Sequence, residues 1–333
     1  MTLDLAKVRA DVSIRGMDIG LFRGVWPLDG WDYRRKVTIT EQSGNDLTDY
    51  QVLVELDSSN FDFTHAQSNG EDVRFADTVG NLFDYWIEEW DAVNETAKIW
   101  VKVPSIPANG TTELYMYYGN PSASSESDGD ATFLLFDDFE GGALDTNKWL
   151  NAGSETWSVE SGYLVIEPTD SNQYLVSKQA VGAYSIVIES KIKSEQAGDL
   201  SAHPGLIWHG NTEVGSSHRN DQVYFRPRRY GSSTFENIQP AYFDGSLVSH
   251  SGKFGSYFDW NIWYELKVEI IDSSTIRLYG DGELWHTWGN QQYSYEGVGF
   301  AAHGGGKDYY DYILVRQYAE PEPSVSIGEE ETA

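Results

Sequence analysis

Residues 133–318 constrain the fold most, because this stretch alternates short apolar and polar segments with turn residues and has no long helical pattern. Tyr264–Ile270 is apolar at every second position, which is the signature of a strand with one buried face. Thr275–Tyr279 and Glu283–Trp288 flank Gly280–Gly282, and this order predicts a hairpin because glycine tolerates the positive φ of tight turns. Many short strands predict an all-β sandwich.

A second set of strand-like segments fills residues 31–121, and Gly, Asn, Asp and Pro clusters separate them. Six short strands in under a hundred residues again indicate a small sandwich. The fold class is therefore all-β, with two antiparallel β-sandwich domains in tandem. The predicted strands lie within Trp31–Thr40, Tyr50–Leu56, Val73–Phe75, Leu82–Ile87, Lys98–Val103 and Thr112–Tyr118.

The domain organisation follows from changes in composition along the chain. Residues 122–132 are rich in Ser, Asp and Gly, which is typical of a linker. Residues 1–30 form an N-terminal arm, residues 31–121 the small sandwich and residues 133–318 the larger one. Residues 319–333 add a last strand and an acidic tail. The arm either packs on its own domain or docks the protein into a larger assembly.

The net charge of −29 excludes several classes of partner. Such a surface repels nucleic acid and anionic membranes, so neither is an expected partner. The acidic residues are spread along the whole chain and aromatic residues make up 14% of it, which argues against disorder.

The dispersed acidic excess indicates a protein adapted to concentrated salt. At molar ionic strength the Debye length falls to about 3 Å, so repulsion between the carboxylates largely disappears. We expect the melting temperature to rise through a series of NaCl and KCl concentrations. Full stability at low salt would contradict this prediction and favour an ordinary acidic extracellular protein.

The chain has no cysteine, so disulfides and thiolate metal sites are excluded. The residues after Met1 show no signal peptide, and no segment reaches the roughly 20 apolar residues of a membrane-spanning helix. A virion protein released by lysis needs neither feature, whereas a cell-surface protein normally needs one of them.

Residues 31–121 resemble a module of unassigned function found in archaeal and bacterial surface proteins. The resemblance rests on the Trp31-x-Tyr33-Arg34-x-Lys36-Val37 opening, Val73-Arg74-Phe75, Trp100-Val101-Lys102-Val103-Pro104 and the closing Tyr117-Tyr118-Gly119-Asn120-Pro121. It implies a surface or adhesive context and names no ligand.

Residues 133–318 resemble a concanavalin A-like, laminin-G-like lectin sandwich, a jelly roll. The matching features are Phe136-Asp137-Asp138-Phe139 followed by Trp149, the Gly280-Asp281-Gly282 hairpin, and the closing Asp311-Tyr312-Ile313-Leu314-Val315. Lectins, hydrolases and structural modules share this architecture, so it implies a fold and not an activity. Trp149 and Trp157 are expected in the core.

Glycoside hydrolases with this sandwich place three acids on one strand as Glu-x-Asp-x-Glu or Glu-x-Asp-x-x-Glu, and this pattern is absent between Trp149 and Asp308. The similar stretch Glu89–Glu95 has an extra residue and is expected to be a turn between strands. A polysaccharide lyase would use a Tyr or His base beside an arginine, and Gln222–Tyr230 near His209 offers such residues. Pairing of these arginines with surface acids is the simpler interpretation. No catalytic residue is therefore predicted.

The resemblance implies a structural calcium ion between the opening acidic element and the closing strand. The matching residues are Asp138 and Asp311, with Asp137, Glu140 and Asp308 as neighbours. Carboxylate oxygens suit calcium, which takes six to eight oxygen ligands. The alternative is that these acids cap turns or face solvent.

Sugar binding requires exposed aromatic faces beside planar polar groups. The candidates on one sheet face are Trp208, His209, Tyr224, Arg226, Arg228, Trp285 and His286. Half of the aromatic residues of any strand point into the core, so several of these could be core residues instead.

These observations predict a non-enzymatic virion surface or fibre protein of a salt-adapted archaeal virus, which binds a host cell-surface glycan or glycoprotein. The N-terminal arm would contact other virion proteins, and a homo-oligomer would strengthen weak binding. The alternatives are a cellular adhesin with a carbohydrate-binding domain and a polysaccharide hydrolase or lyase with atypical catalytic residues.

Overall fold

The computed structural model describes residues 26–168, 173–182, 184–195, 204–210, 223–228, 237–243, 247–249, 260–288, 297–302 and 304–333. The described chain is built almost entirely of antiparallel strands, as the sequence predicts. No described helix is long and apolar enough to span a membrane. Most of the predicted N-terminal arm lies outside the described residues.

The strands of the first part of the chain form two sheets, which we call the N-terminal sheet pair. A four-stranded sheet in the order β22-β1-β6-β3 packs on a three-stranded sheet in the order β2-β5-β4. Alternate residues such as Val37 and Ile39 on one sheet and Val52 and Val54 on the other fill the space between them. The strands are β1 (Tyr33–Thr40), β2 (Leu47–Asp57), β3 (Arg74–Ala76), β4 (Tyr85–Asp91), β5 (Thr96–Ile106), β6 (Thr111–Tyr118) and β22 (Ser324–Thr332).

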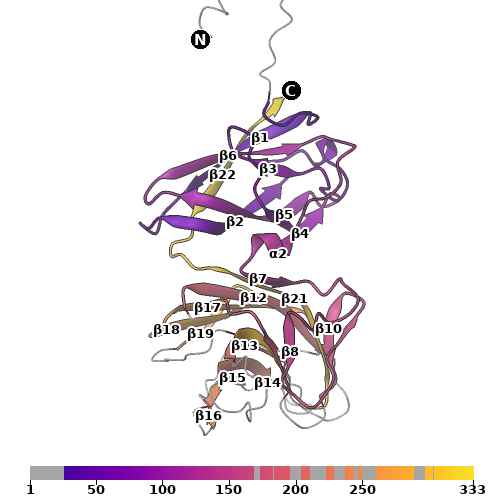
Figure 1. The fold of residues 1–333 in the computed structure, drawn as a ribbon, viewed down its shortest axis with the longest axis vertical. Coiled ribbons are helices and arrows are strands. Elements are labelled where there is room, and N and C mark those ends of the chain that lie inside the picture. Colours follow the sequence, from indigo (N-terminus) through magenta and orange to yellow (C-terminus); the bar gives the residue numbers. More distant parts are fainter. Residues whose placement is uncertain are drawn as a thin grey trace, which may run out of the picture.

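The last strand of the chain belongs to this first sheet. β22 pairs antiparallel with β1, and Ile327 lies opposite Val37. The strand predicted within residues 319–333 is therefore present, and its partner is the strand farthest from it in sequence. Figure 1 shows β22 returning across the molecule to lie beside β1.

The strands from β7 to β21 form two larger sheets, the C-terminal sheet pair. One has the order β19-β18-β17-β12-β21-β10-β9, with β7 also paired to β21, and the other has the order β16-β15-β14-β13-β20-β11-β8. Their bounds are β7 (Leu135–Asp137), β8 (Trp149–Asn151), β9 (Ser158–Glu160), β10 (Tyr163–Ile166), β11 (Gln173–Ser177), β12 (Ile186–Glu195), β13 (Gly205–Gly210), β14 (Val223–Arg228), β15 (Asn237–Phe243), β16 (Leu247–Ser249), β17 (Tyr264–Asp272), β18 (Thr275–Gly280), β19 (Glu283–Trp288), β20 (Gly297–Ala302) and β21 (Lys307–Gln317).

Aromatic residues dominate the core of the C-terminal sheet pair. Trp149 and Trp157 are buried, which confirms the prediction, and Phe300 packs against both. The predicted hairpin joins β18 to β19, with positive φ at Asp281 and Gly282. Gly280 is required there because a Cβ atom would lie 1.8 Å from the Trp285 ring.

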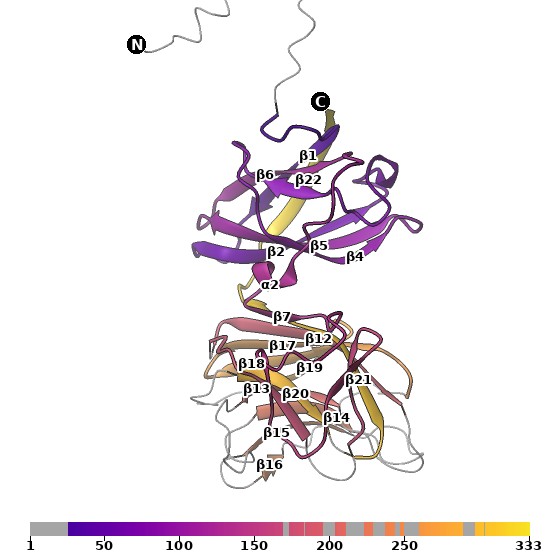
Figure 2. The same ribbon diagram turned by 45° about the vertical axis from the view of Figure 1, so that its right-hand side comes forward.

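A packed junction joins the two sheet pairs. Residues 122–132, predicted as a linker, end in the short helix α2 (Gly129–Thr132), whose N-cap Asp128 accepts a hydrogen bond from the Ala131 amide. Figure 2 shows α2 and β7 between the sheet pairs. An aromatic cluster fills this layer, namely Trp86, Trp100, Phe133, Phe136 and Leu314. The outer face of β4 and β5 is thus buried against the outer face of β7 and β21.

Candidate functional site

Two hollows, of about 330 and about 290 Å³, lie beside this aromatic cluster between the sheet pairs. Four residues line both hollows: Glu88, Lys98, Glu265 and Tyr312. Because they share these residues, the two hollows are neighbours, and we call them together the junction groove. Its walls come from both sheet pairs, so neither pair holds the site alone.

Irregularities in two strands direct side chains into the groove. The register of β4 on β5 shifts between Ile87 and Glu89, which leaves Glu88 as an extra residue. The register of β21 on β12 shifts between Ser190 and Ile192, opposite Asp311 and Tyr312. Such bulges break the alternation of side chains and re-aim them locally. Consecutive residues on each strand therefore face the same hollow, Glu88 with Glu89 and Asp311 with Tyr312.

Glu88 has the most unusual environment in the groove. The Trp100 indole Nε1 donates a 2.7 Å hydrogen bond to its Oε2, and the Tyr312 hydroxyl donates a longer one, 3.4 Å, to Oε1. Burial raises the pKa of the Glu88 carboxyl, and the charges of Glu189 and Glu265 add to this, against the opposing effects of Trp100 and Lys98. Glu88 is therefore a carboxyl group that stays protonated to a higher pH than an ordinary glutamate.

Glu265 lies across the groove from Glu88, on β17 of the other sheet pair. Glu265 is exposed, so its carboxyl group is in contact with water. A buried carboxyl group with a raised pKa and a solvent-exposed acid thus line one depression from the two sheet pairs. Two acids in such different environments are suited to general acid and base catalysis.

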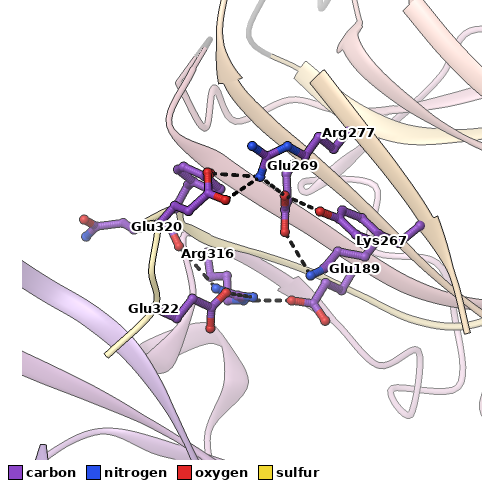
Figure 3. A network of polar contacts seen from close by, with 10 residues as sticks. Glu189, Lys267, Glu269, Arg277, Arg316, Glu320 and Glu322 are labelled. Carbon is purple, nitrogen blue, oxygen red and sulfur yellow. Dashed lines mark hydrogen bonds and ion pairs between the residues drawn. The ribbon is translucent and has the colours of Figure 1, made fainter. Parts of the chain in front are cut away.

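A buried arginine forms the floor of the first hollow. The Arg316 guanidinium donates from Nε to Glu189 at 2.7 Å and from Nη2 to Glu322 at 2.9 Å, and it lies 4.9 Å over the Trp100 ring. Burial alone would lower the pKa of Arg316, but the two carboxylates raise it overall, so it is always charged. Figure 3 shows Arg316 between Glu189 and Glu322.

A second group of ion pairs continues from this floor along β17 and β18. Glu269 accepts from Lys267 at 2.9 Å and lies 3.5 Å from Arg277, which also pairs with Glu320 at 2.9 Å. Figure 3 shows these residues beside the Arg316 cluster. The cations on this wall therefore already have carboxylate partners.

The predicted sugar-binding residues are not assembled into a described site. Trp208 is fully buried and Trp285 is 9% exposed, and both belong to the core of the C-terminal sheet pair. The expectation that they offer stacking faces is wrong, because the strand alternation directs both rings inward. His286 is partly exposed. The backbone of His209, Tyr224, Arg226 and Arg228 lies in β13 and β14, and their side chains lie outside the described part of the structure.

The five predicted calcium ligands are not brought together either. Asp137 accepts from the Trp149 indole at 2.6 Å, and Asp308 is buried against Ser194. The other three predicted ligands, Asp138, Glu140 and Asp311, line the second hollow. Among the described residues, no three His, Cys, Asp or Glu side chains are placed to hold a metal ion. The five residues are therefore not assembled as one ligand set.

Sequence reasoning missed Glu88 and Glu265. Glu265 falls on the polar face of a regular alternating strand, which predicts solvent exposure and gives no sign of the sheet pair opposite. Glu88 lies one residue before Glu89–Glu95, whose predicted turn is confirmed between β4 and β5. The available signal was the Glu88-Glu89 pair, which interrupts the alternation of Tyr85–Trp90.

Comparison with known proteins supports the fold. Residues 69–152 match the family described as a domain of unknown function, DUF2341. An uncharacterized protein of Methanocaldococcus jannaschii is 26% identical over 270 residues, which cover 75% of this chain and 46% of that protein. The chain thus spans about half the length of the curated relative that it matches.

The similar solved structures are glycoside hydrolases with a concanavalin A-like jelly roll. An endo-1,3-β-glucanase catalytic domain from Thermotoga petrophila is 15% identical, with 56% of this chain and 97% of that one covered and a TM-score of 0.41. LamAcat from Zobellia galactanivorans is 15% identical, with 57% and 100% covered and a TM-score of 0.43. An endo-β-1,3-glucanase from Pyrococcus furiosus is 13% identical, with 56% and 95% covered and a TM-score of 0.40.

These comparisons correct the predicted function. The prediction of a non-enzymatic virion surface protein is wrong, because the similar solved structures are polysaccharide-cleaving enzymes and not viral structural or receptor-binding proteins. Likenesses this distant describe the fold, and the assignment of an activity to particular residues has to come from the groove itself.

Proposed function

We propose that the chain is a glycoside hydrolase that cleaves polysaccharide in the junction groove, with Glu88 and Glu265 as its catalytic residues. The observation that carries this proposal is the buried Glu88 carboxyl group, which accepts a hydrogen bond from Trp100 and lines the same depression as the exposed Glu265. Glycoside hydrolysis requires such a pair of carboxyl groups on the two sides of the scissile bond.

The roles follow from the two environments. Glu88 donates its proton to the glycosidic oxygen as the bond to the leaving sugar breaks. Glu265 either removes a proton from the attacking water or attacks the sugar carbon itself. Trp100 orients the acid through its indole N–H, and Tyr312 contacts the other carboxyl oxygen. In the first route, Glu265 releases its proton to solvent and Glu88 takes one up from solvent. In the second route, Glu88 removes a proton from a water molecule that breaks the bond between the sugar carbon and Glu265, and this proton restores Glu88.

The activity is expected to fall as the pH rises, because Glu88 loses the proton that it must donate. Because the pKa of Glu88 is raised, this fall lies above the value of about 4.3 for an ordinary glutamate.

Replacing Glu88 with glutamine tests the proposal most directly. Glutamine keeps the shape of the protonated acid and cannot donate the proton, so we expect the release of reducing ends from a polysaccharide panel to fall by about 10²–10⁴-fold. The matched control is Glu113→Gln, an exposed carboxylate paired with Lys36 on the far face of β1 and β6, which should keep full activity. Equal activity of both variants would exclude Glu88 as the acid.

Other expectations from the sequence stay predictions. We propose that the two sheet pairs are tandem domains, that the protein acts at a cell surface, and that it forms a homo-oligomer. If Asp138 and Asp311 bind calcium, EGTA should lower the melting temperature of the wild type and leave that of Asp311→Ala unchanged. If Asp311→Ala lowers the melting temperature equally with and without EGTA, calcium binding by these residues is excluded.

A further inference from the structure

We infer that the junction groove takes glycans that carry no carboxylate or sulfate groups, and that it favours chains that bear amino groups. This inference rests on the proposed function, because it names the substrate class of the same groove. It is argued from the charges that line the groove and from the partners that those charges already have.

Carboxyl groups outnumber cations along the second hollow. Its acids come from four separate segments of the fold, so they converge on one space and do not form a local acidic run. They are Glu88, Glu89, Asp138, Glu140, Glu265 and Asp311, and the cations are Lys98 and Lys191. Six carboxyl groups thus share this space with two lysines, so the hollow is a negative environment even beside its lysines.

The cations that line the first hollow are already neutralised. Arg316 is held by two carboxylates, and Lys267 lies 2.9 Å from Glu269. Lys98, which reaches both hollows, lies 4.0 Å from Glu89. To pair with one of these three cations, an anionic sugar would have to displace a carboxylate and leave it without its partner.

The field of the whole protein acts in the same direction. A net charge of −29 repels anionic polymers at long range, and a depression between two low-dielectric walls concentrates that field. A neutral glycan is unaffected by the field, and an amino sugar is attracted by it. Specificity for charge is thus set by repulsion as well as by attraction.

The test compares three β-linked oligosaccharides of equal length: a chitosan hexamer, which is cationic, a chitin hexamer, which is neutral, and a hyaluronan hexamer, which carries carboxylates. Their Kd values for Glu88→Gln are measured by calorimetry at 0.15 M ionic strength, so that cleavage does not interfere. We expect chitosan to bind most tightly and hyaluronan at least about tenfold more weakly than chitin.

Variants separate binding in the groove from attraction to the acidic surface in general. Glu89→Gln and Asp311→Asn, each added to Glu88→Gln, should weaken chitosan binding about threefold or more, whereas Glu113→Gln should change it by less than about 1.5-fold. Hyaluronan bound as tightly as chitin, no binding of any hexamer, or groove variants no different from Glu113→Gln would overturn the inference. The expected order of binding without cleavage by the wild type would leave the inference standing and overturn only the proposed hydrolase activity.

Discussion

Replacing Asp308 with asparagine is expected to abolish most of the loss of stability that the wild type suffers as the pH rises from about 4 to 7. Asp308 is fully buried at the start of β21. Its Oδ1 accepts a hydrogen bond from Ser194 Oγ at 2.5 Å, and its Oδ2 has no hydrogen-bond partner within the described part of the chain. Burial raises the pKa of the Asp308 carboxyl to about 7, against the smaller opposing effect of Ser194.

The sign follows from the two protonation equilibria. Below about pH 4 the Asp308 carboxyl is neutral in both the folded and the unfolded state, so its ionisation does not lower the free energy of unfolding. Between about pH 4 and 7 the unfolded state loses its proton first, so the free energy of unfolding falls by about 1.4 kcal/mol per pH unit. Above pH 7 both states are ionised, and a penalty of up to about 4 kcal/mol remains.

Urea unfolding at each pH unit from 4 to 8 measures this effect. The substituted asparagine stays neutral, so the free energy of unfolding of the variant should rise relative to that of the wild type as the pH rises. Its unpaired amide costs about 1–3 kcal/mol at every pH. The control is Asp272→Asn, because Ser274 lowers the pKa of Asp272 and its own contribution lies at lower pH. Parallel curves for the wild type and the Asp308 variant would contradict the prediction.

Replacing Arg316 with methionine is expected to destabilise the protein by about 2–4 kcal/mol. The substitution removes a buried cation and leaves Glu189 and Glu322 facing each other, and unpaired buried charge is costly. We place the effect below the full cost of a broken buried pair because Glu322 is 44% exposed and water screens it. The loss also removes the contact of Arg316 with the Trp100 ring, which joins the two sheet pairs.

The measurement is the free energy of unfolding in urea, with Lys36→Met as the control. Lys36 pairs with Glu113 on an exposed face, so its loss should leave the stability almost unchanged. Arg316→Lys keeps the charge and loses the planar fork, so it should recover part of the stability. A variant no less stable than the Lys36 control would show that the junction does not depend on the arginine.

Local sequence pattern predicted most of the secondary structure. The Tyr264–Ile270 strand, the hairpin at Gly280–Gly282, and the buried Trp149 and Trp157 follow from alternation and from turn chemistry, which act over a few residues. The partner of β22 could not be predicted in this way. The mostly exposed residues of β22 carry no information about which edge strand β22 pairs with.

The candidate site depends on information that is not local. Glu88 and Glu265 are 177 positions apart, and each occupies the polar side of its own strand, where solvent exposure is the ordinary expectation. The sequence does not show whether the Trp208 and Trp285 rings point into the core or away from it, because alternation alone does not tell which face of a strand is buried. In the paired and packed sheets both rings lie in the core.

The sequence by itself determined that the chain is all-β, acidic, free of cysteine and rich in buried aromatic residues, because composition and period-two alternation are properties of short segments. Only the tertiary structure decided that two polar sheet faces lie opposite each other, with bulges in β4 and β21 directing acids into the space between them. The physical reason is that both effects need distant strands to pack together. Only then is Glu88 buried, which raises its pKa, and only then does Arg316 reach its carboxylate partners.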